Sequence, residues 1–329
     1  MKKLYYFPSA SRGGYNNPYS INYKESLKRY FNVLDANNKP VIMQCFGLLR
    51  YAISADVFVI NWIESVSYLR FGILQYIITL FSLHIIEWRK KKVVWMFHNM
   101  QPHEGISSRS KKLTNQMCKV TSVVIAHSKQ AAEYARTMVT CPVYYIAHPI
   151  KTFENISFIN QSSSKAYDVL IWGDILPYKG VAEFLESKEF YQSNIKVKIV
   201  GCCKNTELLA RISNAINKRV YFENKRVEFE KLKGLISDSK YVLFPYIGKS
   251  VSSSGCLIDT LVMGGTPIGP NVGAFKDLSE EKLCLTYNSY NELFKLLNGN
   301  VFVNSDTVRK FIADNSWEKF GDKFVELVK

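Results

Sequence analysis

The sequence predicts an α/β protein of two domains, each built on a parallel β-sheet that helices cover on both faces. Short runs of β-branched and aromatic residues alternate with longer amphipathic stretches along all 329 residues, a pattern typical of strand–helix–strand units. Strands such as Val57-Phe58-Val59-Ile60 are continuously apolar, as expected for a sheet buried on both faces. The length favours two domains, and 47% hydrophobic with 22% charged residues indicates an ordinary globular protein.

The expected strands form two sets of six. The first set is Leu4–Phe7, Val41–Phe46, Val57–Asn61, Lys92–Phe97, Ser122–Ala126 and Val143–Ala147. The second set is Asp168–Trp172, Val197–Val200, Arg219–Phe222, Tyr241–Phe244, Pro267–Gly269 and Leu283–Thr286. Helical patterns between them include Ser20–Phe31, Gln130–Met138, Val181–Glu189, Thr206–Ile216, Glu228–Ser237 and Cys256–Met263.

A polar segment separates the two sets. It follows His148-Pro149 and contains Gln161-Ser162-Ser163-Ser164, a composition typical of an interdomain linker. We therefore expect a first domain at 1–150, a linker at 151–165, a second domain at 166–315 and a C-terminal helix at 316–329. Open parallel sheets bind ligands at the carboxyl ends of their strands, so we expect the site in a cleft between the two sheets.

The net charge of +15 is unevenly distributed. Residues 1–150 carry 19 basic and 7 acidic side chains (19 − 7 = +12), whereas residues 151–329 carry 24 and 21 (24 − 21 = +3). The first domain should therefore be attracted to an anionic surface. Seven cysteines at irregular spacing, with no CxxC pair, predict a reducing, cytoplasmic compartment and no zinc site. The apolar run after Met1-Lys2-Lys3 is too short for a signal peptide.

An apolar run at Phe71–Ile86 precedes Trp88-Arg89-Lys90-Lys91-Lys92. It is shorter than the about 20 residues that a membrane-spanning helix needs, and Gln75 and His84 interrupt it, so we expect no membrane span. Two interpretations stay open. The run is either a buried helix with a solvated basic end, or a helix at a lipid interface where Trp88, Arg89, Lys90, Lys91 and Lys92 meet anionic head groups.

Two loops of the second domain have the composition of a phosphate site. Phe244-Pro245-Tyr246 ends a strand, and Ser252-Ser253-Ser254-Gly255 then begins a helix. The unpaired amides and dipole of a helix N-terminus suit a diphosphate, although a serine-rich N-cap without a ligand has the same sequence. Lys179-Gly180 follows another strand and could neutralise a phosphate leaving group. Neither GxGxxG nor GxxxxGK[ST] occurs, which argues against a dinucleotide or P-loop site.

Among the five histidines, His98 is the functional candidate, because it follows an expected strand and has His103 close to it in sequence. His127 and His148 also follow strands, and we interpret them as structural turn residues. No Asp-x-Asp and no carboxylate cluster at metal-ligand spacing occurs, so no metal is expected.

The order of several motifs resembles that of GT-B glycosyltransferases of the retaining family-4 type. In the second half these are Gly173-x-x-x-x-Tyr178-Lys179-Gly180, Val200-Gly201, 239–246, Ser253-Ser254-Gly255 and 264–268. In the first half the matching positions are Gly13-Gly14 with Asn17-Pro18-Tyr19, Phe97-His98-Asn99 with Pro102-His103-Glu104, 126–128 and 147–149; Ser316-Trp317 matches at the C-terminus.

The resemblance implies two Rossmann-like domains facing across a cleft, with the C-terminal helix crossing back to the first domain. It implies retaining, metal-independent transfer of a sugar from a nucleotide-diphosphate sugar, with UDP or GDP undetermined, and no separate cofactor. We expect the acceptor to be a hydroxyl of a saccharide or polyprenyl-linked saccharide of bacterial surface polysaccharide synthesis, and the protein to be cytoplasmic, peripheral on the inner face of the plasma membrane.

The resemblance also assigns roles to residues. Lys179 would contact the diphosphate, and His98 would face the transferred sugar. Donor-binding positions would be Gly173, Ser253, Ser254, Gly255 and Asp259, the last on the ribose; Gly13, Gly14, Asn17 and His103 would form the loop between acceptor and donor.

Two positions depart from the family pattern. Asp174 stands where many members carry a basic residue, and Val251 stands where the first glutamate of Glu-x7-Glu is expected. Alternatives that stay open are a GT-B nucleotide-sugar epimerase, a catalytically silent membrane-surface module and a nucleic-acid-binding protein. No RRM, KH or helix-turn-helix pattern supports the last, so nucleic acid is not an expected partner.

Overall fold

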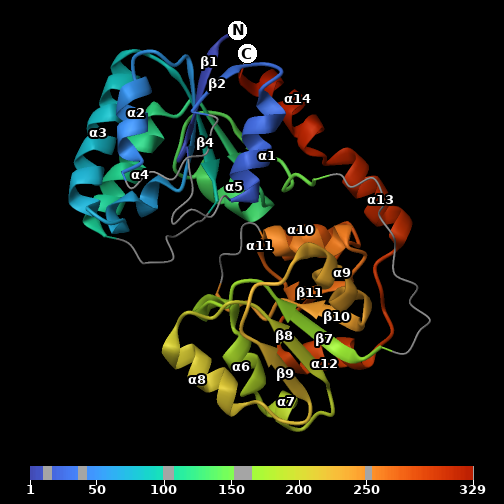
Figure 1. Cartoon of the computed structure of the whole chain (residues 1–329). Helices are drawn as coiled ribbons and strands as arrows, with labels where there is room; N and C mark the ends of the chain where they lie inside the picture. The colour runs from blue at the N-terminus through green and yellow to red at the C-terminus, as the bar shows by residue number, and fades with distance from the viewer. Residues whose placement is uncertain (10–16, 36–42, 99–106, 152–164, 249–253, 329) are drawn as a thin grey trace. The chain divides into compact units, whose positions relative to one another are not determined.

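A computed structural model describes residues 1–9, 17–35, 43–98, 107–151, 165–248 and 254–328 (Figure 1). The chain divides into two compact units: unit 1 is Met1–Lys151 with Asn315–Lys329, and unit 2 is Thr152–Asp314. Each unit contains a six-stranded sheet in which the paired strands run parallel. The predicted α/β class with two parallel sheets is therefore confirmed.

The sheet of unit 1 has the order β2-β1-β3-β4-β5-β6. Its strands are β1 (Lys3–Phe7), β2 (Asn32–Leu34), β3 (Val57–Asn61), β4 (Lys92–Phe97), β5 (Val123–Ala126) and β6 (Val143–Tyr145). Its helices are α1 (Pro18–Leu27), α2 (Cys45–Tyr51), the 3-10 helix η2 (Ile63–Tyr68), α3 (Gly72–Trp88), α4 (Ser108–Val120), α5 (Lys129–Arg136) and α14 (Trp317–Val328).

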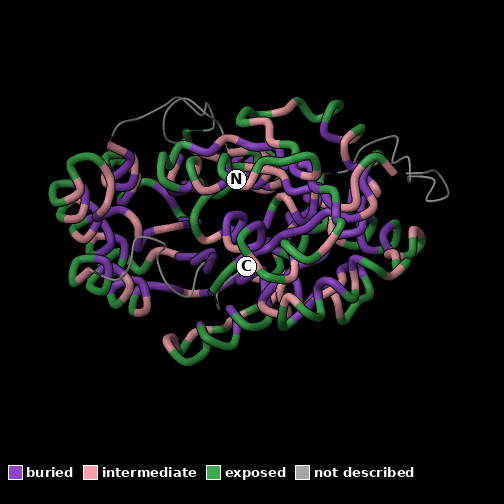
Figure 2. The backbone as a smooth tube through the Cα atoms, turned by 90° about the horizontal axis from the view of Figure 1, so that it is seen from below, coloured by how far each residue is buried: buried purple, intermediate pink, exposed green. Residues whose placement is uncertain are grey.

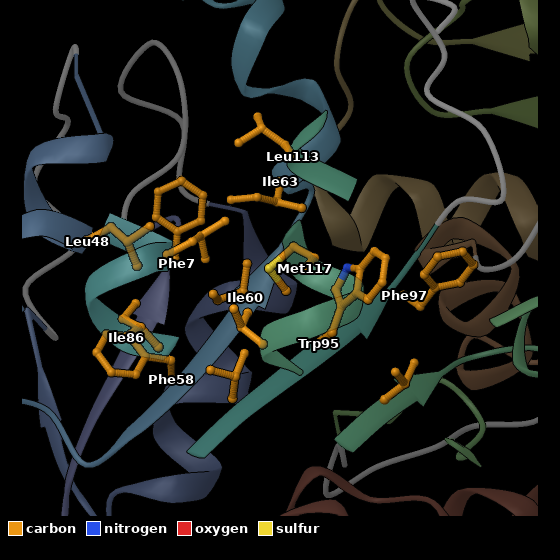
Figure 3. Packing of buried hydrophobic residues seen from close by; sticks show 14 of the residues in the cluster. Phe7, Leu48, Phe58, Ile60, Ile63, Ile86, Trp95, Phe97, Leu113 and Met117 are labelled. Atoms are coloured by element: carbon orange, nitrogen blue, oxygen red, sulfur yellow. The ribbon is translucent and has the colours of Figure 1, made fainter. Parts of the chain in front are cut away.

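Alternate side chains of the inner strands β1, β3, β4 and β5 enter two separate cores, as the two-residue period of a strand requires. Tyr5 and Phe7 of β1 join the core under α2, α3, α4 and α5, whereas Leu4 and Tyr6 join the core under α1 and α14. Figure 3 shows the first core, with Ile86 of α3 and Met117 of α4 packed against strand side chains such as Phe58 and Trp95. The C-terminal helix α14 contacts α1.

The sheet of unit 2 has the order β12-β11-β10-β7-β8-β9. Its strands are β7 (Tyr167–Trp172), β8 (Val197–Val200), β9 (Val220–Glu223), β10 (Ser239–Leu243), β11 (Pro267–Pro270) and β12 (Leu285–Tyr287). Its helices are the 3-10 helix η3 (Pro177–Lys179), α6 (Val181–Leu185), α7 (Lys188–Tyr191), α8 (Thr206–Asn214), α9 (Phe229–Ser237), α10 (Gly255–Val262), α11 (Gly273–Glu280), α12 (Tyr290–Asn298) and α13 (Ser305–Asp314). The inner strands β3, β5 and β8 are buried along their whole length, whereas the edge strands β2, β6, β9 and β12 are not. Figure 2 shows how buried and exposed stretches alternate along the backbone.

Two sequence expectations about elements were wrong, and one strand was missed. The expected strand Val41–Phe46 is contradicted at its end, because Cys45 and Phe46 begin helix α2, while 41–42 lie outside the described residues. The short edge strand β2 was not expected. The expected helix Val181–Glu189 is two helices, because the Ser187 hydroxyl accepts a hydrogen bond from the amide of Phe190 and starts α7 as a separate helix.

The strand order reverses at one place in each sheet. In unit 1, β2 pairs with one side of β1 and β3 pairs with the other side. In unit 2, β8 pairs with one side of β7 and β10 pairs with the other side. Loops that leave the carboxyl ends of such strands diverge in opposite directions and leave room for a ligand. The candidate site residues lie at these two edges.

Candidate functional site

The edge of unit 2 is built around Gly173, which directly follows β7. Its φ of 99° lies in the left-handed region that favours glycine. A Cβ at this position would lie 2.9 Å from Cys256 Sγ and 3.3 Å from Lys179 Nζ. Gly173 therefore allows the lysine side chain and the first turn of α10 to approach the end of β7.

Lys179 is buried at the end of η3, with 8% of its surface exposed. Gly180 follows it with φ 64°, and a Cβ there would overlap the carbonyl oxygen of Pro245. The close approach sets Lys179 beside the chain that leaves β10, with its Nζ 5.6 Å from the ring centroid of Tyr246. In the described part of the chain Lys179 forms no ion pair. A buried ammonium group without a carboxylate is unfavourable in isolation and attracts an anion.

Helix α10 begins at the same place. The Ser254 hydroxyl caps it by accepting a hydrogen bond from the amide of Leu257 at 3.3 Å, and it lies 3.4 Å from the Tyr246 hydroxyl. The indole N–H of Trp172, the last residue of β7, donates to Thr260 at 3.0 Å and holds α10 on the strand end. The amides of the first helical turn have no intrahelical acceptor, and the helix dipole adds positive charge there. Lys179 and the N-terminus of α10 therefore meet at Gly173.

Asp259 lies one turn into α10 and is partly buried. Burial raises the pKa of its carboxyl to about 6. A carboxylate that is partly desolvated gains more than an ordinary one from a ligand hydroxyl that donates to it.

Asp174, the departure from the family pattern, is paired with an arginine. The guanidinium of Arg226, which follows β9, donates to the Asp174 carboxylate at 3.3 Å. Both side chains are half exposed. No local sequence pattern connects these two positions, because 52 residues separate them.

The edge of unit 1 contains a chain of hydrogen bonds across three strand ends. The side-chain amide of Asn61, the last residue of β3, donates to the carbonyl of Phe7 at the end of β1 at 2.9 Å. Its oxygen accepts a hydrogen bond of 2.9 Å from Nε2 of His98, which follows β4. Since the Nδ2 group is committed to Phe7, the oxygen faces the ring, and His98 carries its proton on Nε2.

His98 is held neutral. Burial, and secondarily His148, lowers its pKa to about 3. Its ring stacks on Trp62 with centroids 4.5 Å apart and planes inclined by 17°. Trp62 has a φ of 47°, a strained backbone conformation for a large side chain. The stack and the Asn61 hydrogen bond fix the ring and leave Nδ1 as its acceptor atom.

Two further histidines, His127 and His148, pack their rings against Tyr19 of α1. His127 donates from Nδ1 to the carbonyl of Ile146 at 2.7 Å and accepts from the Tyr19 hydroxyl at 2.6 Å. Burial lowers the pKa of His127 well below its usual value, and it lowers the pKa of His148 to about 4. His127 thereby connects Tyr19 of α1 to the chain that follows β6. Across the residues that the structure describes, no group of three or more His, Cys, Asp or Glu side chains has the arrangement of a metal site.

The structure thus brings together Gly173, Lys179, Ser254, Gly255 and Asp259 in unit 2, while His98 lies in unit 1. Asn17, expected in the acceptor loop, caps α1 by accepting from the amide of Tyr19 at 3.0 Å. Gly13, Gly14, His103 and Ser253 lie outside the described residues. Sequence reasoning missed Asn61, Trp62, Arg226 and Cys256. The signal for Asn61 was available, since it is the polar residue that ends an otherwise apolar buried strand.

No protein-family model and no curated protein matches the sequence. Solved structures do. HepE from Anabaena, in complex with UDP-glucose, has 12% identity and a TM-score of 0.69 over 99% of both chains. AviGT4, a glycosyltransferase involved in avilamycin A biosynthesis, has 13% identity and a TM-score of 0.62 over 100% of this chain and 97% of its own. A trehalose-6-phosphate synthase, an enzyme studied for glycosyltransfer with retention, has 10% identity and a TM-score of 0.61 over 99% of this chain and 98% of its own.

These likenesses span the whole chain and agree with both sheets. The chain therefore has the GT-B fold, as the resemblance in the sequence implied.

Proposed function

We propose that this protein is a glycosyltransferase that moves a sugar from a nucleotide-diphosphate donor to a hydroxyl group of an acceptor. The observation that carries the proposal is Lys179, a buried ammonium group without a carboxylate partner in the described chain, set beside the N-terminus of α10. The structures of similar fold support the donor class, because HepE binds UDP-glucose.

In this mechanism the reaction develops negative charge on the diphosphate as it leaves the sugar. The Lys179 ammonium and the amides at Ser254, Gly255 and Cys256 stabilise that charge without moving, because the fold holds them at the end of β7 before the donor binds. The Asp259 carboxylate accepts hydrogen bonds from the ribose. Many members of the family carry a second basic residue at the position of Asp174, and here Arg226 supplies that positive charge instead. The ion pair with Asp174 positions the guanidinium of Arg226.

His98 acts as a positioning acceptor and not as a general acid. Its pKa of about 3 keeps it neutral at physiological pH, and its Nε2 proton is used by Asn61. The remaining ring nitrogen can accept a hydrogen bond from a hydroxyl of the transferred sugar. Transfer with retention fits the trehalose-6-phosphate synthase of similar fold. We propose a saccharide acceptor of bacterial surface polysaccharide synthesis, carried on a polyprenyl lipid, which the charge of +12 on residues 1–150 supports.

A thermal-shift series with UDP, GDP and their sugars tests the donor class, because a ligand that binds only the folded protein raises its melting temperature. One nucleotide should stabilise the protein, and Lys179→Ala should abolish that shift. Lys188→Ala is the matched control, since Lys188 is an exposed lysine of α7. No shift with any nucleotide, or an equal shift in Lys179→Ala, contradicts the proposal. Interconversion of nucleotide sugars without an acceptor would instead identify an epimerase.

A further inference from the structure

Helix α3 exposes a row of large apolar side chains. Ile73, Leu74, Ile77, Phe81 and Trp88 are 61%, 48%, 54%, 58% and 77% exposed. Their spacing of three, four and seven residues places them on one face of the helix. We call these five residues the α3 stripe. An exposed apolar patch of this kind on a folded domain marks an interaction surface.

The opposite, buried face of α3 also contains polar side chains, so the apolar residues of this helix are not all used in the core. Gln75, Thr79 and Ser82 are buried there, beside Leu83 and Ile86. The side-chain amide of Gln75 donates to the Arg70 carbonyl at 2.8 Å, and the Ser82 hydroxyl donates to the Ile78 carbonyl at 2.7 Å. A surface helix of a globular protein normally turns polar residues outward and apolar residues inward. Here three polar residues share the inner face with Leu83 and Ile86, while five large apolar residues face outward together with His84.

Basic side chains border both ends of the stripe. Exposed Arg70 precedes α3, and its guanidinium lies 5.1 Å from the ring centroid of Phe71. Exposed Arg89 and Lys90 follow the helix, with the Arg89 guanidinium 5.9 Å from the Trp88 ring centroid. Of the basic run singled out in the sequence, Lys91 and Lys92 are half-buried; Lys91 lies 3.8 Å from Asp56, and Lys92 begins β4.

The neighbouring helix extends the positive charge. Helix α4 contacts α3, and the two stand side by side in Figure 1. It exposes Arg109, Lys111, Lys112 and Lys119, and its sequence contains no acidic residue. The one acidic residue of α3, Glu87, accepts a hydrogen bond of 2.6 Å from Gln116 of α4. An apolar face between cationic groups is complementary to a lipid surface that carries negative head groups.

The length of α3 decides between crossing a membrane and lying on it. Within the described chain no helix combines the length and hydrophobicity that a membrane span requires. At 17 residues, α3 is roughly 25 Å long, and its buried face is already packed on the core of unit 1. Only the stripe is available for lipid, so the helix can lie in the plane of the interface.

We propose that α3 docks unit 1 on an anionic lipid surface, with the stripe among the acyl chains and Arg70, Arg89 and Lys90 at the head groups. A second copy of this chain is a weaker occupant, because two faces bordered by arginine and lysine repel each other. The proposal deepens the proposed function by placing the protein where a lipid-linked acceptor would be. The docking itself requires neither nucleotide nor sugar transfer.

Co-sedimentation of the full chain with vesicles tests the docking. Vesicles of phosphatidylglycerol and phosphatidylcholine in equal amounts should bind the protein, and vesicles of phosphatidylcholine alone should bind it at least tenfold more weakly. Ile77→Glu/Phe81→Glu should reduce binding to the anionic vesicles more than tenfold. Tyr191→Glu/Ile216→Glu is the matched control, because it places two charges on exposed apolar residues of unit 2 and should bind as the unchanged protein does.

A second variant separates the charge from the apolar contact. Arg89→Glu/Lys90→Glu should weaken binding several-fold and make the remaining binding less sensitive to salt. Circular dichroism and the nucleotide-induced melting shift of each variant distinguish loss of docking from loss of fold or of donor binding. Equal binding of Ile77→Glu/Phe81→Glu and the unchanged protein overturns the proposal. The proposal is also overturned if the unchanged protein is a stable dimer, the Ile77→Glu/Phe81→Glu variant is a monomer, and neither of the two binds vesicles.

Discussion

The side-chain amide of Asn61 and the ring of His98 are joined by a hydrogen bond at the edge of the sheet of unit 1. Asn61 donates to the Phe7 carbonyl and accepts from His98 Nε2, each at 2.9 Å. The first hydrogen bond fixes which way the amide faces, and the second fixes which nitrogen of His98 carries the proton. Tautomer and orientation of the histidine thus depend on a residue that does not need to touch the substrate itself.

Asn61→Ala should lower the free energy of unfolding by about 1–3 kcal/mol, because it leaves a buried carbonyl and a buried ring N–H without partners. It should also lower kcat by roughly tenfold or more while the nucleotide Kd changes little, since the proposed site for the donor diphosphate is in unit 2. Chemical denaturation and steady-state kinetics measure the two effects. If Asn61→Ala instead raised the nucleotide Kd by the same factor by which it lowered kcat, Asn61 would not act through His98.

Lys179→Met should separate stability from donor binding. Among the residues that the structure describes, the Lys179 ammonium has no carboxylate partner, so its removal should leave the melting temperature of the nucleotide-free protein unchanged or higher. The nucleotide-sugar Kd, measured calorimetrically, should rise at least tenfold because the diphosphate loses its cation. A variant that binds the donor normally would remove Lys179 from the mechanism.

Gly173→Ala should destabilise the protein by about 1–3 kcal/mol, because residue 173 has a positive φ and its Cβ would crowd Cys256 and Lys179. Gly234→Ala is the control. Gly234 lies inside α9, and a Cβ there meets nothing within 4 Å, so this change should stabilise the protein by up to about 1 kcal/mol. Urea unfolding of both variants makes the comparison; equal effects would contradict the packing around Gly173.

Asp259→Asn should stabilise the nucleotide-free protein at pH 7.5. The pKa of Asp259 is raised to about 6 by burial, so the folded state binds more protons than the unfolded state between about pH 4 and 6, and its stability falls as pH rises through that range. Because the group is partly exposed, we expect about 1–2 kcal/mol. The gain should shrink at pH 4, where Asp259 is protonated in the folded state. A gain independent of pH would contradict the raised pKa.

Three of the buried strands could be predicted residue by residue. The expected bounds Val57–Asn61, Lys92–Phe97 and Val197–Val200 are those of β3, β4 and β8, because burial on both faces makes most of their positions apolar. The three-residue edge strand β2 offers no such run. Around Cys45 a short apolar run is compatible with strand or helix, and packing of α2 on the sheet decides for the helix.

The arrangement of the candidate site could be predicted only where its residues are close in sequence. The turn at Gly173, Lys179 and Gly180 and the cap at Ser254 are local patterns of glycine and serine. Asn61 and His98 are 37 residues apart, and Asp174 and Arg226 are 52 apart. Such pairs are created by the order of strands in the sheet, which no local pattern encodes. The stripe on α3 was recognised as apolar, but which of its faces is covered depends on how α3 packs.

Helix α14 belongs to unit 1 although unit 2 precedes it in the chain. Its Trp317, Phe320 and Phe324 complete the core that Tyr23 and Leu27 of α1 begin. During translation, unit 2 can therefore mature while unit 1 still lacks part of its hydrophobic interior. The ribosome must synthesise α14, after all of unit 2, before the core between α1 and the sheet of unit 1 is complete. Products truncated before residue 317 should therefore be recognised by chaperones and proteases through the uncovered aromatic side chains of α1.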